Sequence, residues 1–279
     1  MTNRVFDYLS ASKHARHLAG LDLGHGRKAA IWYNDDDQMR YDAPKGHAFS
    51  YYLAGGEGSL RVDGPTQRGW PGALCVFPEG HSSEWKLTEP FRFVHLYVPD
   101  DHLRASFAQT HDRDARLLDV PERTFDAPQT LSRPLQALAE AAAKGDILAA
   151  DGCYAELVAA LPERPIHLKG GLAPKVLRRV DDWIEAHLDQ DIRLEDLAAL
   201  ADLSEFHFHR MFRASRGVPP HRWVMLLRIA RAKDLLSHSP IADVAAACGF
   251  SHQSHLNRAF KAAMSLTPGQ YKAALRNAA

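Results

Sequence analysis

The side chains best placed to do chemistry lie in two segments, residues 194–223 and 241–271, that follow one pattern. Each segment contains a pair of apolar residues four apart: Phe208 and Phe212 in the first, Leu256 and Phe260 in the second. Because residues four apart share one face of a helix, burying them turns the polar residues between them outward. Outward polar side chains on such a helix can enter the major groove of DNA. The chemistry indicated is recognition through hydrogen bonds.

The cysteines, the other reactive side chains, show no pattern of a metal or disulfide site. Cys75, Cys153 and Cys248 stand far apart, and no two form a CxxC pair. An odd, scattered set argues against a disulfide framework and a zinc cluster, and it favours a reducing cytoplasm. The first residues, MTNRVFDYLSASKHARH, have no apolar core and predict no secretory signal. No apolar run approaches the roughly 18 residues of a membrane span.

The net charge of zero hides an asymmetry between the two ends of the chain. Residues 1–167 carry 18 Lys and Arg against 23 Asp and Glu, whereas residues 168–279 carry 16 against 11. Within residues 205–279 the imbalance is 11 basic against 3 acidic residues. This distribution favours a polyanionic partner at the C-terminal end.

Short strand-like runs fill the first third of the chain. They are rich in aromatic and β-branched residues and cover 29–33, 48–53, 59–62, 73–77 and 91–98. Turn formers such as GGEG and DGP separate them, and this spacing predicts a sandwich or small barrel. In the last run, strict alternation places four side chains on one face: Phe91, Phe93, His95 and Tyr97.

From Pro128 the composition becomes rich in Ala and Leu, which predicts helices. One apolar stripe, made of Leu131, Leu135, Leu138 and Ala142, recurs at helical spacing. It must be buried either against a second copy of the chain or against the chain's own barrel. Residues 162–174 are then rich in proline, with two adjacent glycines, and predict a linker between domains.

The two C-terminal segments also correspond in their turns and caps. Gly249 suits a turn residue with positive φ, and Asp202 is its less favourable counterpart. Ser204 and Ser251 are placed to cap the second helix of each copy. Between the copies, Pro220 begins a predicted helix that continues to about Ser237 and rises roughly 25 Å. A spacer of that length can hold two recognition helices near one DNA turn apart, about 34 Å.

The last hundred residues resemble the AraC/XylS family of bacterial transcription regulators. The resemblance covers KGGLAP at the end of the predicted linker, both copies of the repeated segment and the closing stretch GFSHQSHLNRAFKAAMSLTPGQY. Ser265 departs from the family pattern, which usually has glycine at the end of this helix, and slight local strain is expected there. Gly217 keeps the glycine in the first copy.

The resemblance implies contacts with base edges at seven positions: Phe206, His209 and Arg210 in the first copy, and Gln253, Ser254, Asn257 and Arg258 in the second. Arginine can bind guanine through two hydrogen bonds, and Gln or Asn can do so with adenine. Phe206 can touch a thymine methyl group. The alternative for each residue is an ordinary solvated side chain.

The first half resembles the cupin-like, sugar-sensing domains that precede this DNA-binding unit in many family members. Residues 71–85, PGALCVFPEGHSSEW, are similar to the second cupin motif. The metal ligands of such domains are largely missing, since Phe49 stands at the second ligand position after His47 and Ser83 replaces a histidine. We therefore expect no metal, no other cofactor and no catalytic site.

A barrel of this size can hold one small ligand. The inward candidates mix aromatic faces with a few polar groups, as binding pockets require: His47, Tyr51, Trp85, Phe93, His95 and Tyr97. Each of them alone is better explained as ordinary barrel core than as a ligand contact.

Together these features predict an α+β protein with a cupin-like barrel in residues 1–125, a helical segment in 126–161, a linker in 162–174 and a DNA-binding domain with two helix-turn-helix motifs in 175–279. The expected function is a cytoplasmic, homodimeric transcription regulator, an activator, that binds double-stranded DNA and RNA polymerase and responds to a small organic effector such as a sugar. Two alternatives stay open: a cupin-type enzyme with an appended DNA-binding domain, and a regulator whose barrel only dimerises.

Overall fold

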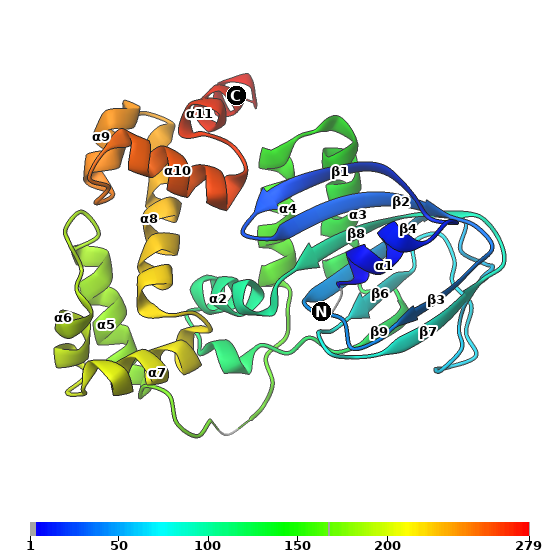
Figure 1. Ribbon diagram of the computed structural model, residues 1–279, viewed down its shortest axis with the longest axis horizontal. Helices are drawn as coiled ribbons and strands as arrows, with labels where there is room; N and C mark the ends of the chain where they lie inside the picture. Colours follow the sequence, from blue (N-terminus) through cyan, green and yellow to red (C-terminus); the bar gives the residue numbers. More distant parts are fainter. Residues whose placement is uncertain (1–3, 167, 279) are drawn as a thin grey trace. The chain divides into compact units, whose positions relative to one another are not determined.

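The computed structural model describes residues 4–166 and 168–278. Their contacts divide the chain into two compact units (Figure 1). The first combines the residues up to Leu103 with 119–162, and the second combines 104–118 with the residues from Glu163 onward. The first is rich in strands and the second is helical, which confirms the predicted α+β class. No described helix is both long enough and apolar enough to cross a membrane.

The first unit contains most of its strands before residue 100. In chain order its elements are α1 (Val5–Ala11), β1 (Arg16–Gly24), β2 (Arg27–Asn34), β3 (Asp37–Tyr41), β4 (His47–Ala54), β5 (Ser59–Arg61), β6 (Leu74–Phe77), β7 (Ser83–Leu87), β8 (Phe91–Val98), β9 (Arg123–Asp126), α3 (Gln129–Lys144) and α4 (Ile147–Ala159). Helix α2 (Asp100–His111) has residues in both units.

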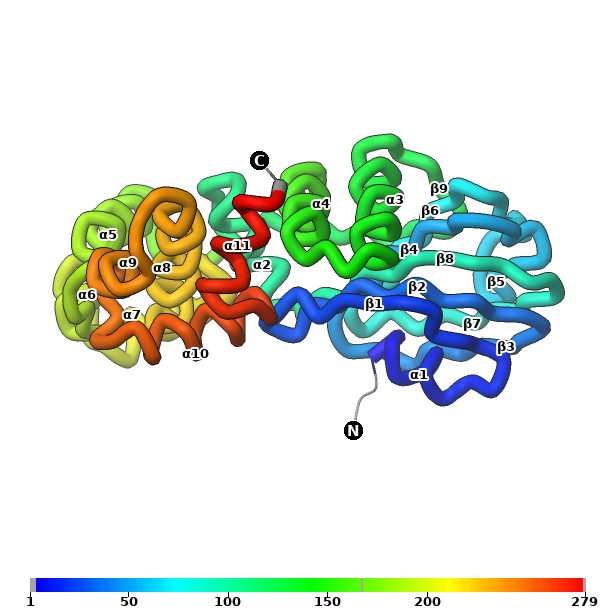
Figure 2. Tube along the Cα trace, turned by 90° about the horizontal axis from the view of Figure 1, so that it is seen from above, coloured from blue at the N-terminus to red at the C-terminus, as the bar shows by residue number. Residues whose placement is uncertain are grey.

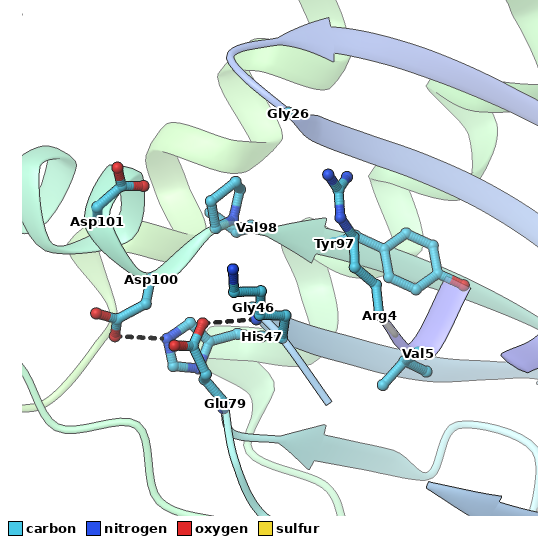
Figure 3. Close-up of a pocket in the computed structure, with 12 residues that line it drawn as sticks. Arg4, Val5, Gly26, Gly46, His47, Glu79, Tyr97, Val98, Asp100 and Asp101 are labelled. Atoms are coloured by element: carbon cyan, nitrogen blue, oxygen red, sulfur yellow. Dashed lines mark hydrogen bonds and ion pairs between the residues drawn. The ribbon is translucent and has the colours of Figure 1, made fainter. Parts of the chain in front are cut away.

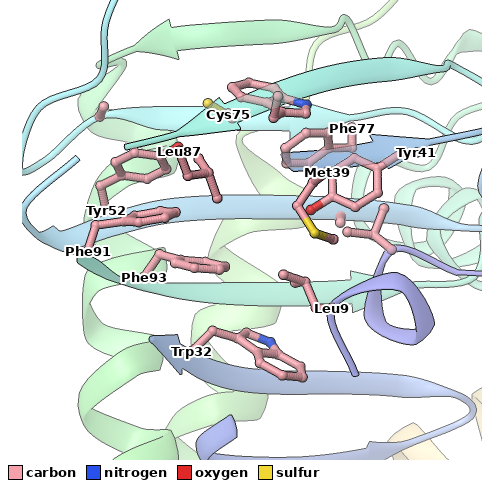
Figure 4. Packing of buried hydrophobic residues seen from close by; sticks show 14 of the residues in the cluster. Leu9, Trp32, Met39, Tyr41, Tyr52, Cys75, Phe77, Leu87, Phe91 and Phe93 are labelled. Carbon is pink, nitrogen blue, oxygen red and sulfur yellow. The ribbon is translucent and has the colours of Figure 1, made fainter. Parts of the chain in front are cut away.

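The strands form two antiparallel sheets, a six-stranded one in the order β1-β2-β8-β4-β6-β9 and a three-stranded one in the order β3-β7-β5. Aromatic and aliphatic side chains from both sheets and from α1 pack together into one core (Figure 4). Among the described strands, no backbone ladder pairs a strand of one sheet with a strand of the other, so the predicted barrel is open rather than closed.

The register of β4 determines which of its side chains reach this core. Ser50 lies opposite His95 of β8, and cross-strand partners share one face of a sheet. Side chains alternate between faces along a strand, so His47 and Tyr51 lie on the face opposite to His95. The prediction that His47 and Tyr51 point inward with His95 is therefore wrong.

Helices α3 and α4 lie together against the outer face of the six-stranded sheet (Figure 2). The predicted apolar stripe of α3 is almost completely buried there, with Leu135 at 0% and Leu138 at 1% exposed. The stripe thus packs on the chain's own sheet, the second of the two alternatives, and leaves no free area for a dimer contact.

The second unit contains two helix-turn-helix pairs, which one long helix separates along the chain. Its elements are η1 (Ala115–Leu117), α5 (Pro174–Ala186), α6 (Leu194–Leu200), α7 (Glu205–Arg216), α8 (Pro220–Leu236), α9 (Ile241–Ala247), α10 (Gln253–Met264) and α11 (Pro268–Ala278). Helix α8 spans 17 residues, which confirms the predicted spacer.

Residues 104–118 belong to this second unit, although the sequence boundaries placed them in the barrel. Ala105, Ala108 and Ala115 are buried in the core around α5, α6 and α7. The linker is also attached to this unit: the Arg164 N–H donates to the Leu117 carbonyl (2.7 Å), and the Leu172 N–H donates to Ser215 Oγ (3.0 Å). The second unit is therefore assembled from two separate stretches of chain.

Candidate nucleic-acid interface

Helix α7 presents one ridge of exposed side chains. Phe206, Arg210 and Arg213 follow each other along it and are exposed, with His209 half-buried beside them. Phe206 is 80% exposed, although burying a phenylalanine side chain stabilises a protein by about 1.5–3 kcal/mol. The aromatic ring and the arginines together form one apolar and cationic surface on α7.

Helix α10 presents the same ridge at the equivalent positions of the second copy. Ser254, Arg258 and Lys261 are exposed there, and Asn257 is half-buried. Gln253 is exposed at the first position of the helix. The structure thus brings together the predicted base-contacting residues of each copy on one face of its second helix.

The predicted side chains on both ridges are not engaged within the protein. Within residues 4–166 and 168–278, no hydrogen bond or ion pair involves the side chains of the seven predicted residues: Phe206, His209, Arg210, Gln253, Ser254, Asn257 and Arg258. Their donors and acceptors are therefore available to the edges of bases.

Arg213 and Lys261 extend these ridges and were missed as contact residues by the sequence reasoning. Both are exposed, and they occupy equivalent positions directly after the buried Phe212 and Phe260. Cations at such positions suit DNA phosphates, which fix the orientation of a protein on the duplex. The alignment of the two copies contained the signal, because it pairs Arg213 with Lys261.

The caps of the two helices differ. Ser204 is the N-cap of α7, and its side chain accepts a hydrogen bond from the His207 N–H (3.4 Å), as predicted. Ser251 does not cap α10, because the helix begins one residue later, with His252 at the N-cap and no side-chain cap. Leu256 follows Ser251 by five residues, whereas Phe208 follows Ser204 by four, and this additional residue moves Ser251 away from the first helical N–H groups.

Equivalent aromatic contacts hold the two ridges in place. The Phe212 and Trp223 rings meet edge to face with centroids 6.4 Å apart, and the Phe260 and Tyr271 rings do so at 5.2 Å. Edge-to-face pairs contribute roughly 0.5–1.5 kcal/mol beyond the area they bury. Helices α7 and α10 are therefore each fixed against the helix that follows them.

A further contact attaches the second copy to the first. Arg228 of α8 donates to the carbonyls of Leu188 (3.1 Å) and Gln190 (2.6 Å), which follow α5. Gly249, with φ +69°, packs so closely that a Cβ there would lie 2.2 Å from the Leu188 carbonyl oxygen. This contact fixes the spacing between α7 and α10.

In the first unit, the predicted ligand residues Trp85, Phe93, His95 and Tyr97 share the core between the sheets. Trp32 Nε1 donates to Tyr97 Oη (2.9 Å), which lies 2.9 Å from His95 Nδ1. Burial lowers the pKa of His95 to about 3, so the imidazole is neutral. The cavity beside these residues measures about 20 Å³, room for about one water molecule and not for an organic ligand.

The predicted ligand residue His47 lies in a separate pocket of about 360 Å³ (Figure 3). The Glu79 backbone N–H donates to His47 Nδ1 (3.2 Å), so Nε2 carries the proton that is directed at Asp100 Oδ1 (3.1 Å). Glu79 Oε2 in turn accepts from the Gly46 N–H (2.6 Å). Both ring nitrogens of His47 are thus used to join β4, the loop before β7 and the start of α2. Among the described residues, no group of three or more His, Cys, Asp and Glu is arranged to hold a metal ion.

Comparison with known proteins locates a shared domain at the C-terminal end. A family model described as a helix-turn-helix domain matches residues 197–274. The probable transcriptional regulator LumQ of Photobacterium leiognathi is 33% identical over 99 residues, 35% of this chain and 40% of that protein. The chain thus spans less than half the length of this relative.

Two further comparisons extend this result. The MmsAB operon regulatory protein of Pseudomonas aeruginosa is 27% identical over 283 residues, 98% of this chain and 88% of that protein. The solved DNA-binding domain of AdpA, in complex with a target DNA, is 34% identical with a TM-score of 0.35, and the match covers 37% of this chain and 94% of that chain.

Proposed function

We propose that the chain is a transcription regulator of the AraC/XylS type, which its C-terminal helix-turn-helix domain resembles, and that it binds two successive major grooves of double-stranded DNA. One observation carries the proposal: α7 and α10 present equivalent ridges whose polar side chains have no partner within the described chain. The 17 residues of α8 rise about 25 Å between them, which suits recognition helices about one DNA turn apart.

Within these ridges we assign base reading to Arg210 and Arg258, and phosphate contacts to Arg213 and Lys261. The guanidinium of arginine matches the two acceptors of guanine in the major groove. Phe206 at the start of α7 supports an apolar contact with a thymine methyl group. These roles predict that substitution of Arg210 or Arg258 changes the base preference. Substitution of Arg213 or Lys261 should instead lower the affinity for all DNA sequences alike.

Binding of fluorescent duplexes to the full-length protein tests these assignments. Arg210→Ala and Arg258→Ala should each weaken binding to the preferred sequence by about 1–3 kcal/mol, roughly five- to 150-fold. Arg178→Ala is the matched control, because Arg178 is an exposed arginine of α5 outside the ridges. Unchanged affinity in both ridge variants would exclude the proposed interface.

We further propose that the protein acts in the cytoplasm as an activator that contacts RNA polymerase, and that a small organic effector bound by the first unit changes its activity. A sheet domain attached to a DNA-binding unit supports this division of roles. An effector regulates only if it binds one state of the protein more tightly than the other. Transcription in vitro from a promoter carrying the preferred sequence tests the direction of control, since an activator raises the amount of transcript.

A further inference from the structure

A large groove lies outside the core of the first unit, next to α3 and α4. It measures about 1010 Å³, at the upper end of the roughly 300–1,000 Å³ typical of sites for small molecules. We call it the outer groove and define it by its lining: Tyr51, Trp70, Gly72, Ala127, Gln129, Thr130, Ser132, Arg133, Gln136, Glu156, Ala159 and Ala160. All these residues belong to the first unit.

Several residues that line the outer groove have polar side-chain groups without partners among the described residues. The hydroxyl oxygen of Ser132 is buried and has no hydrogen-bond partner among the described residues. An unpaired buried hydroxyl costs about 1–3 kcal/mol, which a ligand that bonds to it would recover. The side chains of Tyr51, Gln129 and Gln136 likewise form no hydrogen bond within the part of the chain that the structure describes.

The core between the sheets offers a ligand no such space, because its cavity measures about 20 Å³. Several of its polar side chains also bond to each other, as in the hydrogen bond from Trp85 Nε1 to Ser83 Oγ (2.9 Å) and the contacts of Tyr97 with Trp32 and His95. The pocket around His47 has more space, but its histidine and glutamate bond within the protein.

The charges of the outer groove define the class of ligand. Its lining contains one cation, Arg133, and one anion, Glu156, which form an ion pair of 3.1 Å between α3 and α4. A charged ligand would lose hydration without finding an unpaired countercharge, which is unfavourable. Tyr51 and Trp70 add two aromatic surfaces, and rings stack well on such surfaces.

We propose that the outer groove is the binding site of the effector, and that its ligand is an uncharged ring compound with amide or hydroxyl substituents. The ring packs against Trp70 and Tyr51, and the substituents bond to Ser132, Gln129 and Gln136. This assignment rests on the proposed response to an effector and moves the site from the inside of the predicted barrel to its outer face.

Saturation-transfer NMR on the full-length protein tests the site with three probes of similar size: benzamide, which is neutral, benzoate and benzylammonium. Benzamide should show at least about five-fold more transfer than either charged probe, because burying a charge is costly. Ala159→Phe should reduce this transfer, because the larger side chain occupies part of the groove from an exposed position of α4. Trp70→Leu should weaken it, and Trp183→Leu, a change in the second unit, is the matched control and should leave it intact.

Equal transfer to benzamide in the wild type and in Ala159→Phe would overturn the proposal, as would absence of transfer to benzamide in the wild type. Circular dichroism of Ala159→Phe verifies that the variant is folded. Affinity for DNA, measured in the same samples without a probe, depends on α7 and α10 and tests the proposed function separately. Either result can therefore fail without the other.

Discussion

Arg216 at the end of α7 forms a buried ion pair with Asp181 of α5, and the two side chains are 3% and 15% exposed. Asp181 also accepts a hydrogen bond from Trp223 Nε1 (3.0 Å), and the Arg216 guanidinium lies over the Trp223 ring. Arg216 donates in addition to the carbonyls of Ala108 (3.4 Å) and Arg113 (3.0 Å), at the end of α2. One guanidinium thus joins the first recognition helix to α5, α8 and residues 104–118.

Breaking this ion pair should destabilise the second unit strongly. Arg216→Met leaves Asp181 as an uncompensated buried charge, and removing one partner of a buried pair costs about 3–5 kcal/mol. Urea unfolding followed by far-UV circular dichroism measures the change. Arg213→Met is the matched control, because Arg213 is exposed on the same helix and should change stability by less than about 0.5 kcal/mol. Equal stabilities of the two variants would contradict the role given to Arg216.

The ends of the two recognition helices should respond to substitution in opposite directions. Ser265 has φ +55°, in the left-handed region where a side chain costs roughly 1–2 kcal/mol, so Ser265→Gly should stabilise the protein by up to about 1 kcal/mol. Gly217 has φ +79°, and a Cβ there would lie 2.8 Å from Arg104 Cβ. Gly217→Ala should therefore destabilise by about 2 kcal/mol or more. Thermal unfolding measures both, and a loss of stability in Ser265→Gly would disprove the strain argument.

His95 should make the first unit less stable in acid. Its pKa is lowered to about 3 in the folded protein, so between the ordinary value and about 3 the unfolded chain binds a proton that the folded chain does not. The part of the free energy of unfolding that depends on neutral His95 is fully present above the ordinary pKa of histidine. It is lost as the pH falls, by about 2 kcal/mol between pH 7 and pH 5. Urea unfolding followed by tryptophan fluorescence at the two pH values measures the loss.

His95→Gln is the matched control for this pH dependence. Glutamine retains a polar group near Tyr97 but does not titrate in this range, so the variant should lose less stability than the wild type over the same interval. If the wild type and His95→Gln show the same pH dependence, other groups cause it.

The helical half could be predicted from the sequence because it contains the same pattern twice. The pairs Phe208/Phe212 and Leu256/Phe260 determine one buried face in each copy, and that leaves one outward ridge. The cap at Ser251 could not be predicted in the same way. One additional residue in the turn shifts the start of α10, and helix boundaries are sensitive to such local changes.

The sheet half was less predictable because β4 is buried on both faces. In HAFSYYL, apolar residues occupy both sets of alternate positions, since the core covers one face and α3 covers the other. A strand buried on both sides loses the alternation that fixes its register, and an error of one residue exchanges the faces. His47 and Tyr51 were therefore assigned to the wrong face.

The local sequence of residues 104–118 does not indicate which of the two units they join either. Ala105, Ala108 and Ala115 are small residues that suit a contact with any helix, and the core they join includes Phe212 and Val218, about a hundred residues later. The identity of a long-range partner is a tertiary property. The composition of residues 104–118 does not encode it.

The central claim is that α7 and α10 read two successive major grooves from one face of the duplex. Hydroxyl-radical footprinting, on a sequence selected from random DNA by the full-length protein, tests it most directly. We predict two protected stretches about one helical turn apart on the same face, with Arg210→Ala weakening one and Arg258→Ala the other. A single protected stretch of half a turn, or equal weakening of both stretches by each variant, would contradict it.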